Sequence, residues 1–152
     1  MNTLPHTSEK NYITGKAALN VPNEDGSFAD WHFDEVFLSG RGKIRVAGKD
    51  APETAHLLGS YGIRECGGIL RRFGVSVQTE EKVYVANHIR ALLDMVLNSL
   101  AKNRIPEHVT IEDMLDTTEE REELQTQVKQ LKQKITDQVT LSLLTKWEQK
   151  QH

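Results

Sequence analysis

The chain has 152 residues, of which 38% are hydrophobic and 27% charged, and its formal net charge is -3. This length suits one small domain with an appendage. The one cysteine, Cys66, excludes an intrachain disulfide and a thiolate-rich metal site, and no apolar run approaches the roughly 18 residues of a membrane span. No secretion signal is visible at the N-terminus, so we expect a soluble cytoplasmic protein.

Charge is distributed unevenly along the chain. Residues 1–40 carry 2 Lys/Arg and 6 Asp/Glu, residues 41–104 carry 11 and 6, and residues 105–152 carry 6 and 10. A basic middle segment can meet an acidic partner surface or nucleic acid. It can equally meet the chain's own acidic ends or those of a second copy, and we prefer this simpler interpretation.

The N-terminal third contains short apolar segments between polar stretches. Residues 1–10 are predicted to be a flexible leader, and an apolar segment follows from Tyr12 to Val21. Two further apolar runs, 36–38 and 44–46, are separated by a stretch with two glycines. This pattern predicts a β-hairpin.

The next segments carry helix and strand signals. A helix is predicted from Asp50, a candidate N-cap, to Gly59, and a second short helix over 63–73 is ended by Gly74. Residues 75–86 alternate in polarity, which favours either a strand pair or an extended entry into the following helix.

The clearest helical pattern covers residues 85–103. Its apolar residues recur at helical spacing and form a broad face, made by Ile89, Leu92, Leu93, Val96, Leu97 and Leu100. Arg90 and Asp94 lie off this face as an i,i+4 pair.

The C-terminal third is also predicted to be helical. A long helix over about residues 118–149 should follow the capping box formed by Thr117 and Glu120. Its apolar residues form a narrow seam, Leu124, Val128, Leu131, Ile135 and Trp147. Because a narrow seam is typical of helices that pair, these residues are predicted to bind a partner or to form a homodimeric coiled coil. The alternative is that the seam packs along its own domain.

Together these elements predict an α+β fold, mostly helical, with a small β-hairpin or sheet, several helices and a long C-terminal helix. The expected organisation is the leader over 1–10, a small α+β domain over 11–108, and a helical extension for interaction or dimerisation over 109–152.

The sequence DWH places Asp30 and His32 on one face of an extended segment and Trp31 on the other. Asp30 and His32 could form an acid–base pair, but no nucleophile is evident for them to act on. We prefer the interpretation that Trp31 anchors a small core. The histidines are scattered without metal-ligand spacing, so we expect no catalytic residue, no metal and no cofactor.

A glycine-rich segment is the best candidate for contact with an anion. It carries Arg64, Arg71 and Arg72, although its glycines could simply shape a turn with the arginines solvated. A wider ligand site would add other polar side chains, namely Asp30, His32, Asn87, Arg90 and Asp94. For the last three a structural role, as a helix cap and an ion pair, is the preferred interpretation.

Three stretches, YITGKAALNVP with DWH (12–32), GSYGIRE (59–65) and YVANHIRALLDMV (84–96), resemble small bacterial proteins encoded beside nucleotidyltransferase-like toxins of the abortive-infection type. The resemblance covers roughly residues 12–100, and the segment 35–46 departs from it. It implies an antitoxin or accessory protein that binds the neighbouring toxin.

Three hypotheses follow. The first is a non-enzymatic protein–protein interaction module, an antitoxin-like partner that neutralises a toxin in a prokaryotic two-gene system. The second is a small enzyme or anionic-ligand-binding domain, in which Asp30, His32 and the 85–95 helix converge on one pocket. The third is a DNA-binding autoregulator, which requires the basic residues of 41–72 to gather on one face.

Overall fold

A computed structural model describes residues 4–151 of the chain. Its small sheet consists of four strands of two or three residues each, β1 (Ile13–Thr14), β2 (Arg45–Val46), β3 (Ile63–Glu65) and β4 (Tyr84–Ala86). The strand order is β2-β1-β4-β3, with β1 and β4 parallel and the outer pairs antiparallel. The predicted α+β, mostly helical fold is confirmed.

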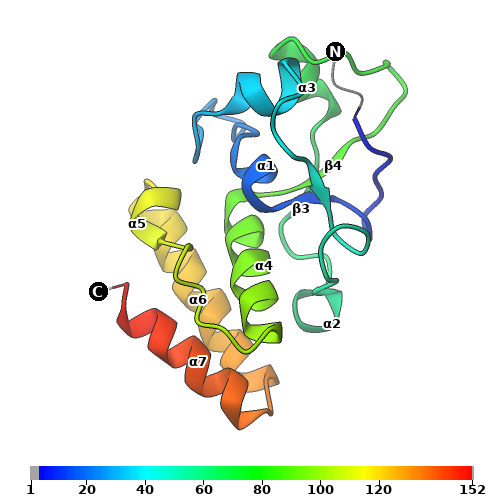
Figure 1. The fold of residues 1–152 in the computed structure, drawn as a ribbon. Helices are drawn as coiled ribbons and strands as arrows, with labels where there is room; N and C mark the ends of the chain where they lie inside the picture. Colours follow the sequence, from blue (N-terminus) through cyan, green and yellow to red (C-terminus); the bar gives the residue numbers. More distant parts are fainter. Residues whose placement is uncertain (1–3, 152) are drawn as a thin grey trace.

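Helix α4 (His88–Ala101) is the central element and packs against β1 and against α1 (Gly15–Leu19). Figure 1 shows α4 between the sheet and the C-terminal helices. The predicted helix over 85–103 is confirmed, with its start set by Asn87, whose side chain accepts a hydrogen bond from the backbone N of Arg90. This cap also confirms the structural interpretation of Asn87.

The predicted β-hairpin over 36–46 is wrong. Residues Asp34–Leu38 form a short π-helical turn, η1, and β2 pairs with β1 instead. The physical reason is packing, because Val36 and Phe37 are both buried in the core, as a single helical turn allows and a two-sided hairpin strand does not.

The remaining short helices are α2 (Ala55–Leu58), α3 (Gly67–Arg72) and α5 (Ile111–Met114). Helices α2 and α3 lie within the predicted helices but are shorter than them. For α3 the reason is that β3 takes up the start of the 63–73 segment. Within 75–86 only β4 is a strand, so no strand pair forms. A turn closed by the hydrogen bond from Glu81 N to the Gln78 carbonyl oxygen precedes β4, and only β4 leads extended into α4.

The predicted single long C-terminal helix is also wrong. The chain forms two helices, α6 (Thr118–Lys134) and α7 (Gln138–Gln149), which lie side by side (Figure 1). Asp137 caps α7, because its carboxylate accepts hydrogen bonds from the backbone N and the hydroxyl of Thr140 at 2.9 and 2.6 Å. An ion pair between Lys132 and Glu148 joins the two helices. The capping box at the start of α6 is confirmed by the hydrogen bonds between Thr117 and Glu120.

The predicted partner-binding seam is already buried inside the chain. None of its side chains is more than 8% exposed, and all belong to the same core cluster as the residues of β1 and α4; they are Leu124, Val128, Leu131, Ile135 and Trp147. The prediction that this seam is free to bind a partner is therefore wrong, and the alternative, packing along its own domain, is confirmed. Residues 109–152 do not protrude as a separate extension, because α6 and α7 both contact α4.

The described part of the predicted leader, residues 4–10, contains no helix or strand, and residues 1–3 lie outside the described residues. Thr7 connects this segment to the sheet, since its hydroxyl accepts a hydrogen bond from the backbone N of Tyr84 at 2.9 Å. Among residues 4–151, no helix combines the length and the apolarity that a membrane crossing requires.

Candidate functional site

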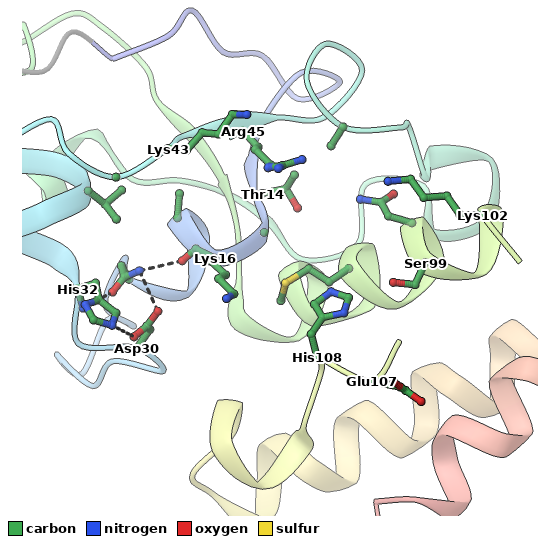
Figure 2. A pocket seen from close by; sticks show the side chains of 18 of the residues that line it. Thr14, Lys16, Asp30, His32, Lys43, Arg45, Ser99, Lys102, Glu107 and His108 are labelled. Atoms are coloured by element: carbon green, nitrogen blue, oxygen red, sulfur yellow. Dashed lines mark hydrogen bonds and ion pairs between the residues drawn. The ribbon is translucent and has the colours of Figure 1, made fainter. Parts of the chain in front are cut away.

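An open cleft of about 860 Å³ lies beside the junction of β1 and α1 (Figure 2). Its walls come from this junction, from residues 30–45, from the C-terminal half of α4 and from residues 102–108. Its charged or titratable lining residues are Lys16, Asp30, His32, Glu35, Lys43, Arg45, Lys102, Arg104, Glu107 and His108. The neutral polar lining includes Asn98 and Ser99 from α4.

Five cations in this cleft, which we call the cleft cations, have no ion pair or side-chain hydrogen bond with another residue between 4 and 151; they are Lys16, Lys43, Arg45, Lys102 and Arg104. The three carboxylates are differently placed. Asp30 and Glu35 flank the His32 ring, at oxygen-to-nitrogen distances of 3.7 and 3.6 Å, and Glu107 forms an ion pair with Lys150 outside the cleft. The cleft therefore attracts anions although the whole chain has a net charge of -3.

The β1–α1 junction brings two sides of the cleft together. Gly15 connects strand and helix with a φ of 69°, a left-handed conformation that glycine adopts without steric penalty, and the next residue, Lys16, lines the cleft. The antiparallel register of β1 and β2 places Arg45 opposite Thr14. Arg45 and Lys43 therefore contribute to the wall beside the junction.

A fully buried ion pair lies directly behind this wall. Arg90 and Asp94 are 0% and 1% exposed, and Arg90 Nε donates to Asp94 Oδ1 at 3.0 Å. The other Asp94 oxygen accepts from the Tyr12 and Thr14 hydroxyls, each at 2.7 Å. Thr14 is thus held by α4 on one side and lines the cleft on the other.

The rest of the Arg90 guanidinium is also satisfied within the chain. Nη1 donates to the carbonyl oxygens of Gly59 and Tyr61 at 2.9 and 2.7 Å, and Nη2 donates to the Thr54 hydroxyl at 3.0 Å. The preferred interpretation of Arg90 and Asp94 as a structural pair is confirmed, and the alternative, contact with a ligand, is wrong, because neither residue lines the cleft. Burial raises the pKa of the neighbouring Tyr12 phenol, and the charge of Asp94 raises it further.

The structure brings together only some of the residues that the second hypothesis places in one pocket. Asp30 and His32 do line the cleft, but α4 contributes Met95, Asn98 and Ser99 instead of Asn87, Arg90 and Asp94. The Asp30–His32 distance of 3.7 Å is longer than a hydrogen bond. Asp30 instead accepts from the backbone N of Trp31 at 2.7 Å and from Asn20 Nδ2 at 3.3 Å.

Trp31 is not a core anchor, and that prediction is wrong. Its side chain is 82% exposed and its ring lies over the His32 ring, with centroids 4.0 Å apart and planes tilted by 33°. The aromatic cluster nearby is formed by phenylalanines, Phe28, Phe33, Phe37 and Phe73. These rings form the aromatic packing of this region, and Trp31 remains at the surface beside the cleft.

The glycine-rich arginine segment does not contribute to the cleft. Arg64 donates to the carbonyl oxygens of Pro22 and Val21 at 2.9 and 3.1 Å, and Arg71 donates to the carbonyl oxygen of Gln78 at 2.9 Å. Arg72 is exposed and, like the other two, does not line the cleft. The basic residues of 41–72 are therefore divided, with only Lys43 and Arg45 among the cleft cations.

No group of three or more His, Cys, Asp or Glu side chains within residues 4–151 is arranged to hold a metal ion. Cys66 is completely buried, and burial raises the pKa of its thiol to about 11, which leaves the thiol protonated and inaccessible at neutral pH.

The sequence analysis did not name any cleft cation individually; Lys43 and Arg45 were included only among the basic residues of 41–72. The available signal was the positive balance of residues 41–104, which contain four of them. Lys16 had no such signal, because it lies within an acidic N-terminal segment and reaches the cleft only through the turn at Gly15.

Comparison with protein-family models, with curated proteins and with solved structures gives no match for this chain.

Proposed function

We propose that this protein is a non-enzymatic binding protein that holds a polyanionic partner in the cationic cleft. The observation that carries this proposal is the set of five cleft cations that have no charged partner among the described residues. Five cations outnumber the three carboxylates of the cleft, and a concave surface with an excess of one sign of charge raises the local concentration of oppositely charged ligands.

The arrangement of Asp30 and His32 supports binding over proton-transfer catalysis. A carboxylate that orients an imidazole for proton transfer does so through a hydrogen bond, with heavy atoms about 2.7–3.2 Å apart. The Asp30 carboxylate is beyond this reach and is engaged by Trp31 N and Asn20 Nδ2 instead. His32 therefore has no orienting carboxylate at catalytic distance in this cleft.

Neutralisation of a nucleotidyltransferase-like toxin is a more specific version of this proposal, and it rests on the resemblance alone. The burial of the C-terminal seam moves the expected contact from α6 and α7 to the cleft. A toxin that binds there would lose affinity when the cleft cations are reversed in charge.

The experiment compares two double charge reversals in the full chain. Lys43→Glu with Arg45→Glu changes the cleft, whereas Lys129→Glu with Lys146→Glu changes two exposed lysines of α6 and α7 by the same total charge. Inorganic polyphosphate is titrated into each protein by calorimetry at low and at high salt. We expect the cleft variant to bind about tenfold more weakly or worse.

The control variant should retain most of the affinity of the original chain, and high salt should weaken binding for every protein that binds. Equal loss in both double variants would indicate attraction to the overall charge and would refute a specific cleft site. No binding of polyphosphate by the original chain at low salt would refute the proposed function altogether.

A further inference from the structure

We infer that the polyanion is a single strand of nucleic acid, whose phosphates contact the cleft cations and one of whose bases stacks on Trp31. This inference rests on the proposed function and names the class of its ligand. It combines two independent observations, the charge of the cleft and an exposed indole at its edge.

The position of Trp31 provides the first half of the argument. The indole is 82% exposed, and it is held over the His32 ring, which itself lines the cleft. A flat aromatic surface fixed beside a cationic groove is the arrangement that proteins use to bind unpaired bases, since every base has a π face. A base stacked on Trp31 would therefore lie next to the cleft that His32 lines.

The distribution of the cleft cations provides the second half. Figure 2 shows His32 at one end of the cleft, Lys102 at the other end and Lys16 between them. Lys43 and Arg45 line the wall beside the β1–α1 junction. One isolated phosphate contacts only a few neighbouring cations, whereas a strand with a negative charge on every nucleotide can follow the whole row.

The neutral groups of the cleft suit bases better than carboxylates. Asn98 and the adjacent Ser99 add an amide and a hydroxyl group to the lining of the cleft. An amide and a hydroxyl both donate and accept hydrogen bonds, so they match the mixed donors and acceptors of a base edge, whereas a carboxylate only accepts. Lysines are also depleted in protein–protein interfaces, whereas nucleic-acid interfaces are strongly positive. These features favour a nucleic-acid strand over an acidic protein segment.

The test uses the full chain and four labelled or competing probes. They are a short oligothymidylate, an abasic deoxyribose-phosphate oligomer of equal length, thymidine monophosphate and polyglutamate of equal charge. Affinities are measured by fluorescence anisotropy of a dye on the probe, or by competition with the labelled oligothymidylate. The key variant is Trp31→Ala, and Val139→Ala on α7, which removes another exposed apolar side chain, is its control.

We expect Trp31→Ala to weaken oligothymidylate binding between about fivefold and 150-fold and to leave the abasic oligomer unchanged. Trp31→Phe should restore part of the loss, because a smaller ring still stacks. The double variant Lys43→Glu with Arg45→Glu should weaken both oligomers and lower the slope of log affinity against log salt by about 1.4, since each single-strand phosphate contact contributes about 0.7.

Equal affinity for the base-bearing and abasic oligomers would overturn the stacking inference while leaving the proposed function intact. Thymidine monophosphate that binds as tightly as the strand would overturn the strand inference in favour of a mononucleotide. Polyglutamate that binds more tightly than oligothymidylate would overturn it in favour of an acidic protein segment. Failure of all four probes to bind would refute the proposed function as well.

Discussion

The carboxylate of Asp94 accepts a hydrogen bond from the hydroxyl of Thr14 at 2.7 Å, across a sequence separation of 80 residues. The central helix therefore holds the strand residue from which the cleft wall begins. The Thr14 side chain therefore connects the wall of the cleft to the ion pair in the core.

Asp94→Asn should destabilise the protein by about 3–5 kcal/mol, because it leaves the Arg90 guanidinium buried without a countercharge. Equilibrium unfolding in urea measures this loss. The double variant Arg90→Met with Asp94→Leu should lose less than the sum of its single variants, since the two residues interact directly. Additive losses would mean that the pair does not act as a unit.

Leu124→Ala should lower stability by about 2–5 kcal/mol, because the side chain of this α6 residue is completely buried and its removal leaves a cavity. The unfolding midpoint should be the same at low and at high protein concentration, since the seam packs within one chain. Val139→Ala, on an exposed position of α7, is the control and should have little effect. A concentration-dependent midpoint, together with a dimeric mass by light scattering that Leu124→Ala abolishes, would show that the seam pairs two chains.

His88 should make stability fall as the pH drops below about 7. Burial lowers the pKa of the imidazole below its ordinary value of 6.5, and Nε2 lies 2.7 Å from the Val21 carbonyl oxygen. Because the folded pKa is the lower one, the unfolded chain takes up the proton first. The contribution of His88 is thus fully present above the unfolded pKa and is lost as the pH falls from about 7 toward the folded pKa.

Urea unfolding at a series of pH values from about 5 to about 8, the range in which histidines titrate, measures this dependence. His88→Gln keeps a side-chain donor for the Val21 carbonyl but does not titrate, so the variant should show a shallower slope in that range. An unchanged slope would assign the pH dependence to other groups.

Glu35→Gln should strengthen polyphosphate binding by about two- to fivefold, because it removes an exposed negative charge from the cleft wall. Glu122→Gln changes an exposed carboxylate of α6 and should leave affinity nearly unchanged. Calorimetric titration at low salt compares the two. Equal effects of both substitutions would show that total charge, and not the cleft, governs binding.

The sequence predicts those helices that are long enough for their apolar residues to recur at a regular spacing. Helix α4 was predicted because its apolar residues recur over four turns, and α6 because of the same spacing after Thr117. The strands of the sheet have two or three residues, too few to show alternation, and pairing partners such as Ile13 and Val85 are far apart in the chain. The break between α6 and α7 has a signal in the sequence, the N-cap residue Asp137 three positions before Thr140. The apolar seam on both sides of it nevertheless favours one continuous helix.

The cleft could not be predicted because its cations come from separate segments that only the fold brings together. Arg90 and Asp94 illustrate the same limit in the core. On a helical wheel they lie off the apolar face, yet Thr54, Gly59 and Tyr61 surround them with hydrogen-bond partners from another part of the chain. Burial of a polar pair depends on such partners, and local spacing contains no information about them.

The two tryptophans of the chain lie in opposite surroundings, with Trp31 82% exposed beside the cleft and Trp147 1% exposed, its Nε1 donating to the Val109 carbonyl oxygen at 2.9 Å. An indole in water emits at longer wavelength than one in an apolar interior. The long-wavelength part of the intrinsic emission therefore comes from the cleft edge and the short-wavelength part from the packing of α7. A change confined to the long-wavelength emission would therefore report an event at the cleft, whereas loss of the fold would also shift the emission of Trp147 to longer wavelength.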